Sequence, residues 1–151
     1  MAAGSFVIHD KAKKYIGAGT GGIDLDGDTF KIALCDNTSN AATTSIDGYA
    51  ALTGELATAN GYTNGGYTLV SITWTESGGT VTFDAADPSW TASGGSITAR
   101  YAVVYDNTVA APVAKPIIAQ VLLDTTPADV TTTSGNTLTL QFAATGILQA
   151  V

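Results

Sequence analysis

Apolar and polar residues alternate with a period of two along most of the chain after residue 28. Such alternation predicts strands with one buried face, because successive side chains of a strand point to opposite sides. It is clearest at residues 30–35, which we expect to be half-buried, and at residues 67–74. A turn at residues 77–79 then leads into residues 80–83, which predicts a hairpin. Further strands are expected around Trp90 and over three later runs: 97–105, 117–123 and 137–142.

The residues before this region favour a helix. The sequence predicts it over Phe6–Ile16, with Gly17 at the position that glycine often occupies just after a helix. Three lysines lie in its second half, where they interact favourably with the helix dipole. A glycine-rich hinge at residues 17–22 follows. One or two further helical turns are expected within residues 49–59.

Six to eight strands separated by Gly, Asn and Pro turns, after one early helix, indicate an all-β protein. No regular alternation of strands with helices is present that would cover a parallel sheet. We therefore predict an antiparallel β-sandwich or jelly roll. The N-terminal helix or arm with its hinge would occupy residues 1–22, and the β-sandwich domain residues 23–151.

The composition agrees with this fold and excludes several classes of protein. Hydrophobic residues make up 45% and charged residues 13% of the 151 residues. Disordered chains need low hydrophobicity and high charge, and coiled coils need many charged helix formers. The net charge of −7 disfavours nucleic-acid binding, because phosphate neutralisation requires clustered cations. The 24 threonines are β-branched and suit strands that expose a hydroxylated face.

Cysteine usage and hydropathy bear on where the protein is made. The single cysteine, Cys35, cannot form an internal disulfide, which fits folding in a reducing cytoplasm. Residues 1–10 lack the basic and apolar regions of a signal peptide. No run reaches the roughly 18 apolar residues of a membrane-spanning helix. We therefore expect cytoplasmic synthesis and no membrane partner.

Two loops match ligand-binding patterns only in part. Residues 17–22 fit G-x-G-x-x-G, but nucleotide binding requires a strand before the motif and a helix after it. Asp24, Asp26 and Asp28 are spaced like the first ligands of a calcium loop, yet Thr29 and Cys35 occupy the positions that need Gly and Glu. A hinge and a turn are the favoured interpretations, and a cation site of another kind at the three aspartates stays open.

The remaining polar residues do not form a recognisable catalytic arrangement. His9 is the only histidine, and the chain has no G-x-S-x-G nucleophile elbow. Zinc needs at least three good ligands, more than His9 and Cys35 provide. Glu55 and Glu76, the only glutamates, lack the aromatic cleft signature of a glycosidase. We therefore expect a protein that is not an enzyme, with no catalytic residues, no cofactor and no metal ligand.

Aromatic residues offer the remaining candidate chemistry. Trp74, Trp90, Tyr101 and Tyr105 suit core packing, a carbohydrate platform or an assembly hot spot, and core packing is the favoured interpretation. A charge-poor surface with open strand edges also suits assembly, because few charges are desolvated on contact. An interface is therefore expected to include these residues: Phe6, Tyr15, Ile16, Trp74 and Trp90.

Three stretches spread over most of the chain carry a family resemblance. Residues 22–34 read G-I-D-L-D-G-D-T-F-K-I-A-L, and residues 49–52 and 61–69 read Y-A-A-L and G-Y-T-N-G-G-Y-T-L. The third combines V-T-F-D at 81–84, Trp90, I-T-A-R-Y-A-V-V-Y-D at 97–106, L-T-L-Q-F at 138–142 and G-I-L at 146–148. Together they resemble a group of virion structural proteins of tailed bacteriophages, over residues 6–148. The resemblance supplies no catalytic residues.

The resemblance implies a small β-rich protein of the capsid exterior, the neck or the tail, made in the bacterial host. The expected function is a capsid cement or decoration protein that binds the outer surface of the shell and stabilises it by mass action. Expected partners are the major capsid protein or other virion proteins, and further copies of the chain in a dimer or trimer. The alternatives are a head-fibre, neck or tail component, a host-glycan-binding adhesin module that uses Trp74 or Trp90, and a small hydrolase.

Overall fold

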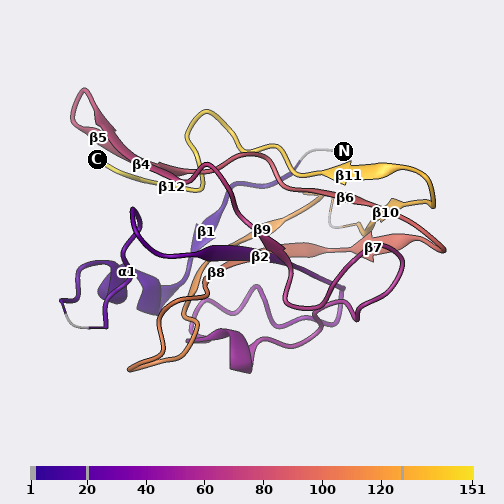
Figure 1. The fold of residues 1–151 in the computed structure, drawn as a ribbon, viewed down its shortest axis with the longest axis horizontal. Coiled ribbons are helices and arrows are strands. Elements are labelled where there is room, and N and C mark those ends of the chain that lie inside the picture. Colours follow the sequence, from indigo (N-terminus) through magenta and orange to yellow (C-terminus); the bar gives the residue numbers. More distant parts are fainter. Residues whose placement is uncertain (1–2, 20, 127) are drawn as a thin grey trace.

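The computed structural model describes residues 3–19, 21–126 and 128–151, whose regular secondary structure is mainly β-strand (Figure 1). The helical segments among them are α1 (Asp10–Ile16) and a single 3₁₀ turn, η1 (Tyr49–Ala51). The all-β class predicted from the sequence is confirmed, whereas the finer choice of a sandwich or a jelly roll stays a prediction. The strands are β1 (Val7–Ile8), β2 (Phe30–Cys35), β3 (Tyr67–Thr68), β4 (Thr73–Ser77), β5 (Thr80–Asp84), β6 (Ser89–Thr91), β7 (Ile97–Ala99), β8 (Tyr101–Asp106), β9 (Ile117–Leu122), β10 (Val130–Thr132), β11 (Thr137–Thr139) and β12 (Leu148–Ala150).

The largest sheet has five strands in the order β1-β9-β8-β2-β3, and all its neighbouring pairs are antiparallel. A three-stranded sheet, β12-β5-β4, and two strand pairs, β11-β6 and β10-β7, complete the described β-structure. The predicted hairpin is confirmed as β4–β5, which turns through Gly78 and Gly79 at φ of 62° and 87°. Two successive positive φ angles are the geometry of a type I′ turn, which glycine adopts without strain.

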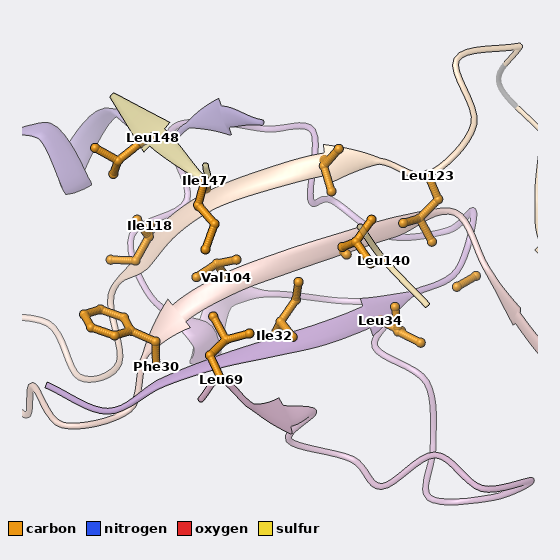
Figure 2. Close-up of a cluster of buried hydrophobic side chains, with 14 of the residues drawn as sticks. Phe30, Ile32, Leu34, Leu69, Val104, Ile118, Leu123, Leu140, Ile147 and Leu148 are labelled. Atoms are coloured by element: carbon orange, nitrogen blue, oxygen red, sulfur yellow. The ribbon is translucent and has the colours of Figure 1, made fainter. Parts of the chain in front are cut away.

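One face of the five-stranded sheet forms the main core. Figure 2 shows Phe30, Val104 and Ile118 among the side chains of this sheet that point into the core. Phe83 of β5 joins them, with its ring centroid 4.9 Å from that of Phe30. The segments after β11 supply the opposite wall through these buried residues: Leu140, Ile147 and Leu148. The three-stranded sheet and the β11–β6 pair therefore lie over this face.

The other face of the sheet is buried as well, so the prediction of a half-buried strand at residues 30–35 is wrong. Ala33 and Cys35 of β2 are fully buried on this second face. The segment at residues 36–52 covers it and contributes Ala41 and Leu52 to a second apolar cluster. This segment is polar enough in sequence to suggest a solvated loop, and its covering role depends on contacts with strands distant in the chain.

The N-terminal segment is part strand and part helix, so the prediction of a helix over Phe6–Ile16 is wrong in its first part. Val7 and Ile8 form β1, which pairs with β9. The helix begins at Asp10 and is followed by Gly17, as predicted. Two adjacent β-branched residues suit a strand, and the edge of β9 provides the hydrogen bonds that favour it over a helix.

Two predicted strands are each divided into two shorter strands, because the chain changes its pairing partner within the run. Residues 97–105 divide into β7 and β8 at Arg100, whose N–H donates to the Cys35 carbonyl at 2.7 Å. The additional residue shifts the side-chain parity, so Ile97 packs in the main core and Val103 in the second. Residues 67–74 divide into β3 and β4 near Ser71, which has a φ of 53°. The prediction of one continuous strand over each of these two runs is therefore wrong.

Candidate functional site

All five predicted interface residues pack against the main core. Tyr15 and Trp90 are buried, with 7% and 6% of their surface exposed. Trp90 meets Tyr67 edge-to-face, with ring centroids 6.0 Å apart. Ile16 and Trp74 are half-buried and pack against the same core. The structure does not bring these four side chains together as one surface.

Phe6, the fifth predicted residue, lines an open groove beside β1. Its ring centroid lies 5.7 Å from that of Phe142, and the two rings are tilted by 57°. The groove has a volume of about 540 Å³, and its walls come from the first residues of the chain, from Val121 of β9 and from residues between 140 and 149. It therefore runs between β1, at the edge of the five-stranded sheet, and β12, at the edge of the three-stranded sheet.

A second hollow of about 300 Å³ continues this groove past β11, and the two share Ala3, Leu140 and Gln141. No charged residue lines either hollow. Such a surface offers apolar contact and backbone hydrogen bonds, but no ionisable group for catalysis. We name the two hollows together the edge groove, which comprises residues 3–6, 8, 121, 123, 130, 138–143 and 145–149.

Polar side chains gather beside the edge of β2, around Glu55. Its carboxylate accepts hydrogen bonds from the Tyr49 hydroxyl, from the Tyr62 hydroxyl at 2.7 Å and from the Gly65 N–H at 2.6 Å. The Tyr62 hydroxyl in turn accepts the N–H of Leu34 at 3.0 Å. One carboxylate thus fastens η1 and residues 62–65 to the edge of β2.

The phenols around Glu55 are held in their protonated form. Burial, and then the hydrogen bond to Glu55, raises the pKa of Tyr49 and Tyr62. Burial raises the pKa of Tyr105 to about 12, and its hydroxyl donates to the Gly65 carbonyl at 2.7 Å. The Tyr49 and Tyr105 rings stack with centroids 4.4 Å apart. Since these hydroxyls serve internal contacts, the network holds the covering segment in place rather than presenting a reactive group.

Two carboxyl groups meet where the Asp-rich turn approaches the end of β8. Asp106 is fully buried, and its Oδ1 accepts the N–H groups of Thr108 and Val109 at 2.7 and 3.1 Å. Burial raises the pKa of Asp106 to about 6, although the two N–H bonds oppose the rise. The nearby Asp28 carboxyl raises this pKa further, and the buried Asp106 Oδ2 makes no hydrogen bond within the described residues. Protonation of Asp106 therefore stabilises the folded state.

The calcium-like spacing of three aspartates forms a turn. Asp24 Oδ1 accepts the N–H groups of Asp26 and Gly27, both at 3.1 Å, and Asp28 Oδ2 accepts the N–H of Asp24 at 2.8 Å. These are the short-range bonds that make aspartate frequent in turns. Within residues 3–19, 21–126 and 128–151, no group of three or more His, Cys, Asp and Glu side chains is placed to hold a metal ion.

His9 and Cys35 are both buried, and each makes its own contacts. His9 Nδ1 lies 3.3 Å from the Ile46 carbonyl oxygen, and burial lowers its pKa. Burial raises the pKa of the Cys35 thiol to about 12. A thiol of that pKa holds almost no thiolate at neutral pH, so it is a poor nucleophile.

The glycine-rich segment at residues 17–22 follows α1, so the strand that a nucleotide-binding loop needs before it is absent from this position. Gly21 has a φ of 77°, and a Cβ there would lie 2.5 Å from the Ala111 carbonyl oxygen. The segment therefore passes close to the loop before β9. Thr20, inside the predicted hinge, lies outside the described residues, as do Met1, Ala2 and Pro127.

Sequence reasoning missed two features that the structure assembles. One is the C-terminal wall of the edge groove, where Phe142 and Ile147 lie; the lack of any charged residue from 130 to 151 is a signal that could have drawn attention to it. The other is the pair Asp28 and Asp106, whose members lie far apart in the sequence. No local pattern links them.

Comparison of the chain with protein-family models, with curated proteins and with solved structures found no match. No helix in the described part of the chain is long and apolar enough to cross a membrane.

Proposed function

We propose that this chain is a non-enzymatic structural protein of a tailed-phage virion, and that it acts as a capsid cement or decoration protein on the outer surface of the shell. One observation carries the proposal: the stretches that resemble phage virion proteins are core elements of the fold. They include β2 at residues 30–34, β5 at residues 81–84 and β8 at residues 101–106. A resemblance in buried strands concerns the whole fold rather than one loop.

The contacts of the chemically capable side chains support a structural function. His9, Cys35 and Asp106 are fully buried, and Glu55 accepts three hydrogen bonds from its neighbours. Each of these groups serves the fold. The edge groove, by contrast, is open and uncharged, as suits a protein that works through assembly contacts.

The proposed mechanism is mass action. A subunit that binds the assembled shell, and not its separated components, lowers the free energy of the assembled state. Several weak contacts made by one oligomer would add avidity. The net charge of −7 suits the outside of the particle better than an interior lined with DNA phosphates.

A glycan-binding adhesin is the less favoured alternative. Such a module needs an exposed aromatic face, whereas Trp90 is 6% exposed and packs against Tyr67. Trp74 is half-buried against the main core. The side chains named for this function thus contribute to packing.

The experiment separates heads from tails of the phage that encodes the chain and measures the protein in each fraction. We expect to find the protein in stoichiometric amounts on heads. Heads that lack the protein should lose their DNA at a lower temperature than complete heads. Adding the purified chain to those heads should restore their stability. Recovery on tails or fibres would contradict the cement role, and absence from particles would contradict a virion role altogether.

A further inference from the structure

Three strands leave one side open along the edge groove. Among the described residues, β1 pairs only with β9, β11 only with β6 and β12 only with β5. The edge that β1 forms extends beyond the strand at both ends. The Gly4 N–H donates to the Leu122 carbonyl, and the His9 N–H donates to the Ile118 carbonyl. An open edge presents backbone donors and acceptors to which a further strand can pair.

The segments that form this edge contain no charged residue, although the whole chain is acidic, and the Asp87 carboxylate beside them accepts the Phe142 N–H at 2.8 Å. The 13 Asp and Glu and the 6 Lys and Arg all lie between residues 10 and 129. Residues 3–8, which carry β1, and residues 130–151, which carry β10 to β12, contain none. Lysine and proline, which commonly block open strand edges, are also absent from both segments.

Exposed apolar side chains border the same edge. In the described part of the chain, three large hydrophobic residues are exposed: Val7 at 44%, Val70 at 50% and Val151 at 101%. Val7 is in β1, and Val151 follows β12 directly. Neither of the valines Val7 and Val70 lines the edge groove; Val7 belongs to the edge strand itself, whereas Val70 lies in the link between β3 and β4.

We propose that this edge is a homodimer interface, in which β1 of one copy lies antiparallel to β1 of a second copy across a two-fold axis. Two copies of −7 repel each other wherever their carboxylates approach, so self-association favours a surface without charge. An uncharged apolar edge is complementary to itself, as a two-fold interface requires. The five-stranded sheets of the two copies then form one continuous sheet, with Val7 near its symmetry mate.

This dimer interface is a surface that the proposed function does not specify. It rests on the proposed function in one respect, because a cement protein is expected to form an oligomer. The dimer is tested with the purified full chain alone. Its failure is therefore distinguishable from failure to bind heads.

Sedimentation equilibrium and light scattering measure the oligomeric state of the wild type, of Val7→Lys and of Val70→Lys. The wild type should be a dimer. Val7→Lys should weaken the dimer at least about tenfold, because two like charges then meet across the axis. Val70→Lys adds the same charge at a comparably exposed valine away from the edge, and it should behave as the wild type. Thermal unfolding checks that both variants fold.

A crosslink gives a second measurement. Under oxidising conditions Val7→Cys should form a disulfide-linked dimer, whereas Val70→Cys should not, and the buried Cys35 stays unreacted in both. A wild type that is monomeric up to millimolar concentration would overturn the proposal. A trimer, or equal weakening by Val7→Lys and Val70→Lys, would overturn it as well.

Discussion

At the scale of single residues, Asp106 shows how burial turns an ordinary carboxyl into a titrating group. It is fully buried, its Oδ1 accepts two backbone N–H groups, and Asp28 lies beside it. Its pKa rises from 3.8 to about 6. Between these values the folded state binds more protons than the unfolded state, so the contribution of Asp106 to stability falls as pH rises through this window.

Asp106→Asn should therefore stabilise the protein at pH values above the folded pKa. The amide oxygen can still accept the two N–H groups, and the amide nitrogen can donate to Asp28. We expect the free energy of unfolding at about pH 7.5 to rise by up to about 3 kcal/mol, from two pKa units at about 1.4 kcal/mol each. The gain should vanish near pH 4. Urea unfolding at both pH values measures it.

Asp26→Asn is the matched control, because Asp26 lies in the same turn as Asp28, the neighbour of Asp106, and is exposed. It should change stability by less than about 0.5 kcal/mol at either pH. His9 titrates in the opposite sense, since burial lowers its pKa and acidification costs stability. Since wild type and variant share His9, its contribution cancels in the difference between their free energies of unfolding. A loss of stability at neutral pH in Asp106→Asn would contradict the assignment.

At the scale of elements, the edge of β2 shows how a strand is completed without a partner strand. β3 pairs with Lys31 and Ile32 only. Beyond it, the Leu34 N–H donates to the Tyr62 hydroxyl, and the Leu34 carbonyl accepts the N–H of Leu56. A side chain thus takes the place of a backbone carbonyl at a buried position.

Tyr62→Phe removes this acceptor and leaves the Leu34 N–H unsatisfied in the core. An unsatisfied buried donor costs about 1–3 kcal/mol, so the free energy of unfolding should fall by that amount. Tyr67→Phe is the control, because the Tyr67 hydroxyl makes no hydrogen bond within the described residues and its ring is half-buried against the main core. It should change stability by less than about 0.5 kcal/mol. Equal effects of the two variants in urea unfolding would refute this account.

At the scale of the whole molecule, one sheet is buried on both faces by different means. The main core is closed by strands, whereas the second face is closed by residues 36–52, which contain no strand. Glu55 and its hydroxyl partners fasten this covering segment. Cys35, fully buried beneath it, reports whether the segment opens separately from the rest of the fold.

We expect the Cys35 thiol to react with a thiol reagent only when the protein unfolds. Its pKa of about 12 and its burial both oppose reaction. Labelling should be slower than in the unfolded chain by about a thousandfold or more, which corresponds to roughly 4 kcal/mol of opening free energy. An added exposed thiol, Val70→Cys, should react at once. Labelling of Cys35 at the same rate as that control would show that the covering segment opens by itself.

The sequence by itself determined the features that depend on neighbouring residues. The antiparallel β class followed from alternating side chains and frequent turns, and the β4–β5 hairpin from Gly78 and Gly79. The end of α1 followed from Gly17. These predictions were sound because a period of two, a positive φ and a helix C-terminus are local properties of the chain.

Only the tertiary structure decided which competing local preference prevailed. Val7 and Ile8 joined a strand because β9 offered an edge, and Arg100 shifted the parity of its run because Cys35 accepted its N–H. The meeting of Asp28 with Asp106, and of Phe6 with Phe142, likewise joins segments far apart in the sequence. Contacts of this kind form only when the chain folds, so no local pattern records them.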